Sequence, residues 1–126
     1  MKKSILLTKN APAPIGPYSQ AVVANGMLYI SGQIAIDPAT NELLDGDLEA
    51  QTDLVMKNLA AVLEFAGSNF RDVVKTTIFL APDQDFATVN KVYGSYLDGN
   101  YPARETVWVH ALPKNVKVEI SMIAAL

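Results

Sequence analysis

The spacing of apolar residues changes near residue 48, from strand-like runs to a helical period. Before it, Asn25-Gly26 separates two apolar runs, and an Asn-Gly pair tolerates the positive φ angles of a two-residue hairpin turn. The short apolar stretch within residues 1–8 predicts one more strand ahead of this hairpin. The polar stretch 37–47 contains a proline and a glycine and is expected to be a loop.

Two amphipathic helices are predicted in the rest of the chain. Apolar residues recur at three, four and seven residues over 48–66, which is the pattern of one helix face. Asp47 can cap the start of this helix, and Gly67 can end it in a left-handed turn. A second apolar stripe covers 86–97, with Asp85 as its N-cap.

Three further strands are predicted from β-branched and aromatic runs at 73–80, 105–111 and 116–125. The order βββαβαββ indicates a single α+β domain over residues 1–126, with a mixed sheet and two helices on one face. Residues 73–80 are apolar on both sides of the strand, so the second face also needs a cover. We expect another copy of the chain to supply it; the alternative is a half-exposed sheet with a few stray apolar residues.

Composition excludes several classes of chemistry. The chain has no cysteine and one histidine, His110, so disulfides, cysteine nucleophiles and multi-histidine metal sites are ruled out, and neither metal nor cofactor is expected. A net charge of -3 with scattered basic residues argues against nucleic acid as a partner. No apolar run approaches the roughly 20 residues of a membrane span. The short N-terminal apolar stretch is no signal peptide, so a cytoplasmic protein is expected.

Arg104 stands at the entrance of the predicted strand 105–111 and Glu119 lies inside the strand 116–125, although charged residues are rare in strands that face a core. If these strands form a hairpin with Ala111 opposite Val116, both charges fall on the face without helices, about 13 Å apart along the sheet. In that register the apolar pairs on the other face are Val109 with Val118 and Val107 with Ile120. A small carboxylate could lie between the charges, held by the arginine fork, with the glutamate as general base. The alternative is a pair of interface charges satisfied by the next subunit.

Four segments resemble the RidA family, also known as YjgF and L-PSP. They are NAPAPIGPYSQAV (10–22), SGQIAIDPATNEL (31–43), VVKTTIFLAPDQDFATVNKVYGSYL (73–97) and PARETVWVHALPKNVKVEISMIA (102–124). The resemblance implies a chorismate-mutase-like fold and a homotrimer with clefts between subunits. It also implies hydrolysis of 2-aminoacrylate and related 2-imino acids to 2-keto acids and ammonium, without a cofactor.

The same resemblance implies roles for individual residues. Arg104 of the PAR motif would hold the substrate carboxylate, Glu119 of the VEI motif would position or activate water, and Tyr18 would line the cleft. The predicted substrate contacts are Ser31, Gly32, Asn90, Thr106 and Phe86. Thr106 stands where the family often has cysteine, and its hydroxyl can still hydrogen-bond a ligand.

Three functions remain open from the sequence. The first is a 2-imino acid deaminase, which needs both Arg104 and Glu119. The second is a regulator that binds a 2-keto acid in the same cleft, for which Arg104 is enough. The third is RNA cleavage, which the acidic balance disfavours.

Overall fold

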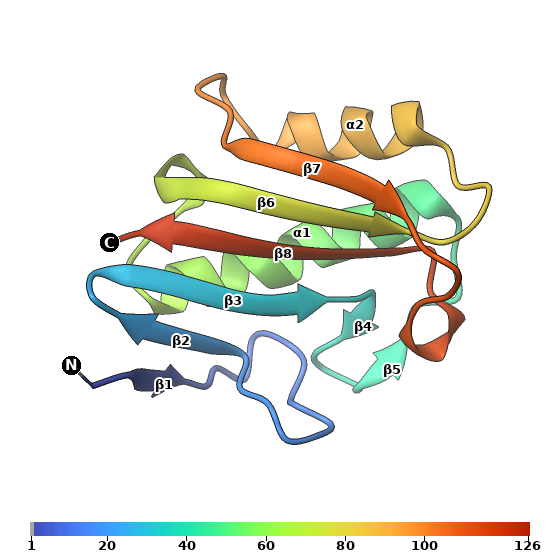
Figure 1. Cartoon of the computed structure of the whole chain (residues 1–126). Coiled ribbons are helices and arrows are strands. Elements are labelled where there is room, and N and C mark those ends of the chain that lie inside the picture. Colours follow the sequence, from blue (N-terminus) through green and yellow to red (C-terminus); the bar gives the residue numbers. More distant parts are fainter. Residues whose placement is uncertain (1) are drawn as a thin grey trace.

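The computed structural model describes residues 2–126 as one sheet with two helices packed against it (Figure 1). The sheet has six strands in the order β1-β2-β3-β8-β6-β7, and β4 and β5 form a separate two-stranded hairpin. The elements are β1 (Ser4–Leu6), β2 (Ala21–Ala24), β3 (Met27–Gln33), β4 (Ile36–Asp37), β5 (Glu42–Leu43), α1 (Leu48–Phe65), β6 (Val73–Leu80), α2 (Phe86–Ser95), β7 (Ala103–Trp108) and β8 (Val118–Ala125).

The two predicted helices and their N-terminal caps are confirmed, but α2 ends at Ser95 and not at residue 97. The Asp47 side chain accepts a hydrogen bond from the Ala50 N–H, 2.8 Å, at the start of α1. Gly67 follows that helix with a φ of +76°, which is the left-handed conformation expected there. Asp85 caps α2 in the same way, accepting from the Thr88 N–H at 3.2 Å.

The two predicted turns before α1 have different outcomes. Asn25 and Gly26 have φ angles of 55° and 73° and join β2 to β3, as predicted. The stretch 37–47 is not entirely a loop, because Ile36 pairs with Leu43 in the β4–β5 hairpin. The strands of this hairpin are only two residues long, so they carry too little alternation to be recognised against a polar background.

The predicted hairpin of the last two strands is wrong. Strand β6 lies between them, parallel to β7 and antiparallel to β8, so Ala111 does not pair with Val116. Residues 109–117 pass over the end of β6 instead, where the Val109 N–H donates to the Leu80 carbonyl at 2.8 Å. A connection of this length can cross one intervening strand, which a two-residue turn cannot do.

The two faces of the sheet differ in burial. Both helices lie on the same side, α1 behind the centre of the sheet and α2 behind β7 (Figure 1). On that helix-covered face the residues of the central strands are only 0–1% exposed; they are Ile78, Leu80, Val118, Ile120 and Met122. On the opposite face, here called the open face, the side chains are partly or largely exposed, at Tyr29, Phe79, Glu119, Ser121 and Ile123. The prediction that the two helices cover a single face is confirmed.

Candidate active site

Arg104 and Glu119 lie on opposite faces of the sheet, and the prediction that they share one is wrong. Arg104 is directly opposite Thr76 on β6, whose side chain is buried under the helices. Glu119 is directly opposite Phe79, which belongs to the open face. The predicted register omitted β6, and with β6 in place Glu119 aligns with Val107 rather than Trp108.

The separation of these two charges is also too large for one small ligand. Their partners on β6, Thr76 and Phe79, are three residues apart, and β7 and β8 are two strand spacings apart. These offsets correspond to about 10 Å along the sheet and about 10 Å across it. A small molecule bound to one copy of the chain therefore cannot contact both Arg104 and Glu119.

Side chains of helix α2 contact the guanidinium of Arg104 on the helix-covered face. The Nη1 group donates to the Asn90 Oδ1 atom at 2.8 Å. The Cζ atom lies 5.5 Å from the ring centroid of Phe86 and 5.2 Å from that of Tyr93, both within cation–π range. Because these three residues are spaced by four and three positions, they form one stripe of the helix.

A hollow of about 330 Å³ lies beside this guanidinium. Its lining residues are Asn90, Tyr93, Gly94, Tyr101, Pro102 and Arg104. An arginine side chain has five N–H donors, and within residues 2–126 the side chain of Arg104 donates only to Asn90. The remaining donors suit a carboxylate, which a guanidinium can bind through two parallel hydrogen bonds.

Thr106 continues the same face of β7 beyond Arg104. It lies opposite the buried Ile78, and its Oγ1 atom is buried with no hydrogen-bond partner in the described part of the chain. An unpartnered buried hydroxyl costs about 1–3 kcal/mol, and Thr106 does not line the hollow beside Arg104. Next along the strand, the ring of Trp108 lies 5.9 Å from that of Phe86, which closes this end of the stripe.

Glu119 projects from β8 on the open face, close to the backbone of β3. A Cβ atom added to Gly32 would collide with its carboxylate, so glycine is what allows this approach. Burial raises the pKa of Glu119 above the ordinary glutamate value, because the charged form is partly removed from water. A carboxyl group with a raised pKa is a better proton acceptor than an ordinary one, which suits a general base.

Tyr18 and Ser31 border the hollow of about 340 Å³ that contains Glu119 and Gly32. The Tyr18 N–H donates to the Gly16 carbonyl at 2.8 Å, and the tyrosine hydroxyl accepts from the Ile15 N–H at 3.3 Å, so the loop supports its own aromatic ring. Ser31 donates through its hydroxyl to the Ser19 carbonyl.

Gln20 anchors this loop and was missed by the sequence reasoning. Its buried side-chain amide accepts from the Thr8 N–H at 2.7 Å and donates to the carbonyls of Thr8, Ala11 and Pro12. It therefore fixes the segment that carries Pro12 against β2. Only one sign of this role is present in the sequence, which is that the amide of Gln20 directly precedes the apolar run 21–24.

The predicted residues thus form two groups rather than one. One group gathers around the guanidinium on the helix-covered side, and we call it the cationic half-site: Arg104, Asn90, Phe86 and Thr106. The other gathers around the carboxylate on the open face, and we call it the carboxylate half-site: Glu119, Gly32, Ser31 and Tyr18.

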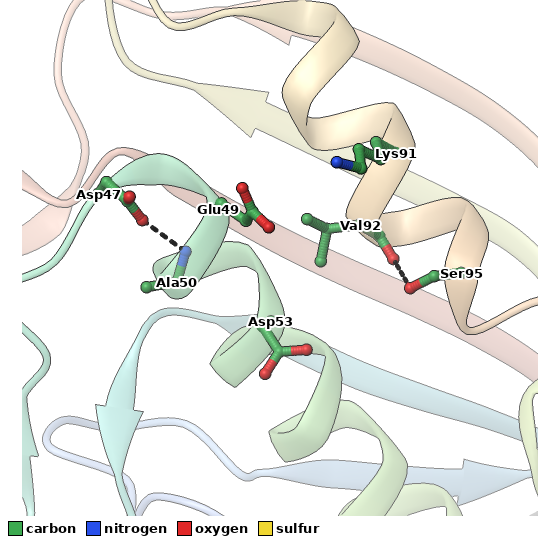
Figure 2. A pocket seen from close by; sticks show the side chains of 7 residues that line it. All are labelled: Asp47, Glu49, Ala50, Asp53, Lys91, Val92 and Ser95. Carbon is green, nitrogen blue, oxygen red and sulfur yellow. Dashed lines mark hydrogen bonds between the residues drawn. The ribbon is translucent and has the colours of Figure 1, made fainter.

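A third hollow, of about 450 Å³, lies between the start of α1 and α2 and is lined by none of the predicted substrate-binding or catalytic residues (Figure 2). Three of its polar groups already serve the fold. Asp47 caps α1, Ser95 donates to the Val92 carbonyl at 2.6 Å, and Asp53 accepts a hydrogen bond from Tyr96 that lowers its pKa. The other charged side chains that line this hollow are Glu49 and Lys91, which carry opposite charges (Figure 2).

Metal-binding and membrane-spanning features are absent from residues 2–126. In this part of the chain no three His, Cys, Asp or Glu side chains come together in a way that could hold a metal ion. Neither α1 nor α2, the two α-helices of residues 2–126, could span a bilayer.

The sheet and its helices define the class of protein: an α+β fold with a cationic half-site on one face and a carboxylate on the other. The family model described as Endoribonuclease L-PSP matches residues 8–126. A 2-iminobutanoate/2-iminopropanoate deaminase from Rattus norvegicus is 45% identical over 122 residues, covering 97% of this chain and 89% of that protein.

Solved structures agree with this match. The Rid family protein YyfA from Yersinia pestis is 51% identical with a TM-score of 0.96, covering 99% of this chain and 100% of the other. E. coli TdcF with bound serine is 40% identical with a TM-score of 0.92, covering 98% of both chains. The chain belongs to the Endoribonuclease L-PSP family, which confirms the resemblance to RidA and the predicted α+β fold.

Proposed function

We propose that this protein hydrolyses 2-imino acids to 2-keto acids and ammonium, at sites formed between copies of the chain. The observation that carries the proposal is the placement of Arg104 and Glu119 on opposite faces of one sheet. Each half-site is incomplete by itself: one has an anion-binding group without a base, and the other has a base without an anion-binding group. A second copy of the chain supplies the missing half.

The two half-sites differ, so the contact between copies joins different surfaces. A head-to-tail contact of this kind closes into a ring when its rotation allows. A homotrimer, as the family resemblance implies, contains three equal sites. The open face supports such a contact, because Tyr29 and Val107 are 45% and 40% exposed there without a cover from their own chain.

The chemistry requires only the two charged groups and water. Arg104 holds the substrate carboxylate and so places the C=N carbon in the cleft. Glu119 accepts a proton as water adds to that carbon, which gives a carbinolamine. The proton then passes to nitrogen, the C–N bond breaks as the C=O bond forms, and the departing ammonia takes up the hydroxyl proton. The protonated imine and water are consumed, and keto acid and ammonium are released, so atoms and charge balance.

Two relatives support a small substrate with a carboxylate and a nitrogen on the adjacent carbon. The rat relative is named for deamination of 2-iminobutanoate and 2-iminopropanoate, and TdcF has serine bound. The family description names an endoribonuclease, but the net charge of -3 with scattered basic residues is unfavourable for phosphate contacts.

The test is a coupled assay in which a serine dehydratase generates 2-aminoacrylate and pyruvate formation is followed. We expect acceleration over buffer by the wild type and almost none by Arg104→Ala or Glu119→Gln. Glu105→Gln, which changes the neighbouring exposed carboxylate on β7, is the matched control and should remain active. An inactive wild type that is correctly assembled would contradict the proposal. Glu119→Gln should still bind 2-keto acids; full activity in this variant would remove Glu119 from the mechanism.

A further inference from the structure

We propose that Tyr93 and Thr76 are positioning residues that hold the guanidinium of Arg104 in place for the substrate carboxylate. This inference rests on the proposed function, since it assigns Arg104 to carboxylate binding. Neither residue was identified from the sequence, and neither is needed as a proton donor or acceptor in the reaction.

The three residues form a closed triangle. Thr76 is the direct partner of Arg104 in the β6–β7 register, so the two side chains leave the sheet side by side on the same face. The Tyr93 hydroxyl donates to the Thr76 Oγ1 atom at 2.9 Å. The Tyr93 ring, 5.2 Å from the Arg104 Cζ atom, then lies against the guanidinium. A bond at the far end of the ring thus fixes the surface on which Arg104 rests.

Thr76 is a polar residue in an apolar setting. It is 0% exposed and stands on the same side of β6 as Ile78 and Leu80, which are also fully buried. A hydroxyl in this position is tolerated because Tyr93 satisfies it, and a valine of the same shape would fill the space equally well. Packing alone therefore does not explain a threonine here.

The Tyr93 hydroxyl stays protonated at neutral pH. Tyr93 is 5% exposed, and burial raises its pKa above the ordinary tyrosine value. The hydroxyl remains a donor to Thr76, and the ring keeps its neutral face toward the cation.

A held guanidinium binds an anion more tightly than a free one. Arginine has several rotatable bonds, and immobilising a free side chain on binding lowers the affinity. In this protein Asn90 and the rings of Phe86 and Tyr93 restrict Arg104 before the substrate arrives. The contribution of the Tyr93–Thr76 hydrogen bond should therefore appear in carboxylate affinity and KM, and only weakly in kcat.

The experiment compares Tyr93→Phe, Thr76→Val and the double variant with the wild type. Binding of 2-ketobutyrate is measured by calorimetry, and kcat and KM by the coupled assay. We expect each single change to weaken binding and raise KM about 3- to 10-fold, in line with one hydrogen bond, with kcat within about twofold. The double variant should be no worse than either single one, because both remove the same bond. Thr76→Ser keeps the hydroxyl and should restore wild-type binding.

Tyr96→Phe is the matched control, because it also removes a tyrosine hydroxyl at the C-terminal end of α2. That hydroxyl donates to Asp53 on α1, away from Arg104. Its loss should lower the unfolding temperature without changing the affinity for 2-ketobutyrate. If Tyr93→Phe and Thr76→Val behave like Tyr96→Phe, the inference is wrong while the proposed function stands. If the wild type neither binds the keto acid nor hydrolyses the imine, the proposed function fails, and this inference fails with it.

Discussion

The helix-covered face and the open face of the sheet are built from the same strands but have different tasks. Along β8, Ile120 is completely buried under the helices, whereas its neighbours Glu119 and Ser121 are only partly covered on the other side. The covered face holds apolar side chains that stabilise the single chain. The open face keeps apolar area and a carboxylate uncovered, which suits association and chemistry better than folding.

The two charged residues follow this division. Arg104 gains its surroundings from α2, within its own chain. Glu119 gains only partial burial from its own chain, and the hollow beside it is formed by β3 and the loop that carries Tyr18. In the proposed assembly the cationic half-site of one copy meets the carboxylate half-site of the next.

The largest expected effect compares two isoleucines of β8 on opposite faces. Ile120→Ala should lower the free energy of unfolding by about 2–5 kcal/mol, because it opens a cavity in a fully buried core. Ile123→Ala, on the open face, should cost less than half as much in the dissociated chain, where its side chain is only partly buried. Denaturant unfolding at low protein concentration measures both. Equal losses would contradict the difference between the faces.

A smaller effect is expected at the contact between β3 and β8. Gly32→Ala places a methyl group where the Glu119 carboxylate lies, and the flexible glutamate can rotate away at little cost. We expect activity to fall about 10- to 100-fold, as a misplaced catalytic group does, while the free energy of unfolding changes by about 1 kcal/mol or less. Ser121→Ala, the next open-face residue on β8, is the control and should retain activity.

The free energy of unfolding should depend on pH in a way that reports the partial burial of Glu119. Its pKa is raised from 4.5 by desolvation, so the folded state binds the proton more tightly than the unfolded state. The resulting stabilisation is present below pH 4.5 and is lost as the pH rises through the folded pKa. Glu119→Gln lacks this proton-linked stabilisation. The wild type should therefore lose stability relative to the variant as the pH rises from 4.5 through the folded pKa. The opposite sign in denaturant titrations would contradict a desolvated carboxyl group.

The same shift predicts the pH profile of activity. A general base works in its deprotonated form, so kcat/KM should fall as the pH decreases through the raised pKa of Glu119. The midpoint of this fall should lie above the 4.5 of an ordinary glutamate. A profile that is flat down to pH 4.5 would show that another group, or none, accepts the proton.

Local features of the fold could be predicted from the sequence, because they depend on neighbouring residues. The period of the apolar residues defined α1 and α2, and Asp47 and Asp85 marked their starts. Strand 73–80 was also predicted with the bounds that β6 has. The order of the strands depends on contacts between distant segments, and nothing in the apolar pattern showed that β6 separates β7 from β8.

The candidate site shows the same limit. The motifs pointed to Arg104 and Glu119, but the face that each occupies depends on strand order, and the assumed hairpin placed them together wrongly. Tyr93 and Thr76 are 17 residues apart in the chain. Their contact requires α2 to pack over β6 and β7, so neither the helical period nor the strand alternation reveals it.

Subunit mixing tests the central claim most directly. Arg104→Ala and Glu119→Gln are each expected to be inactive, and a mixed assembly joins the intact arginine of one chain to the intact glutamate of the other. If the two residues act from different copies, random 1:1 mixing after dissociation should restore about a quarter of the wild-type activity, since half of the chains carry each intact group. If both residues act within one chain, the mixture stays as inactive as its components, and the proposed site is wrong.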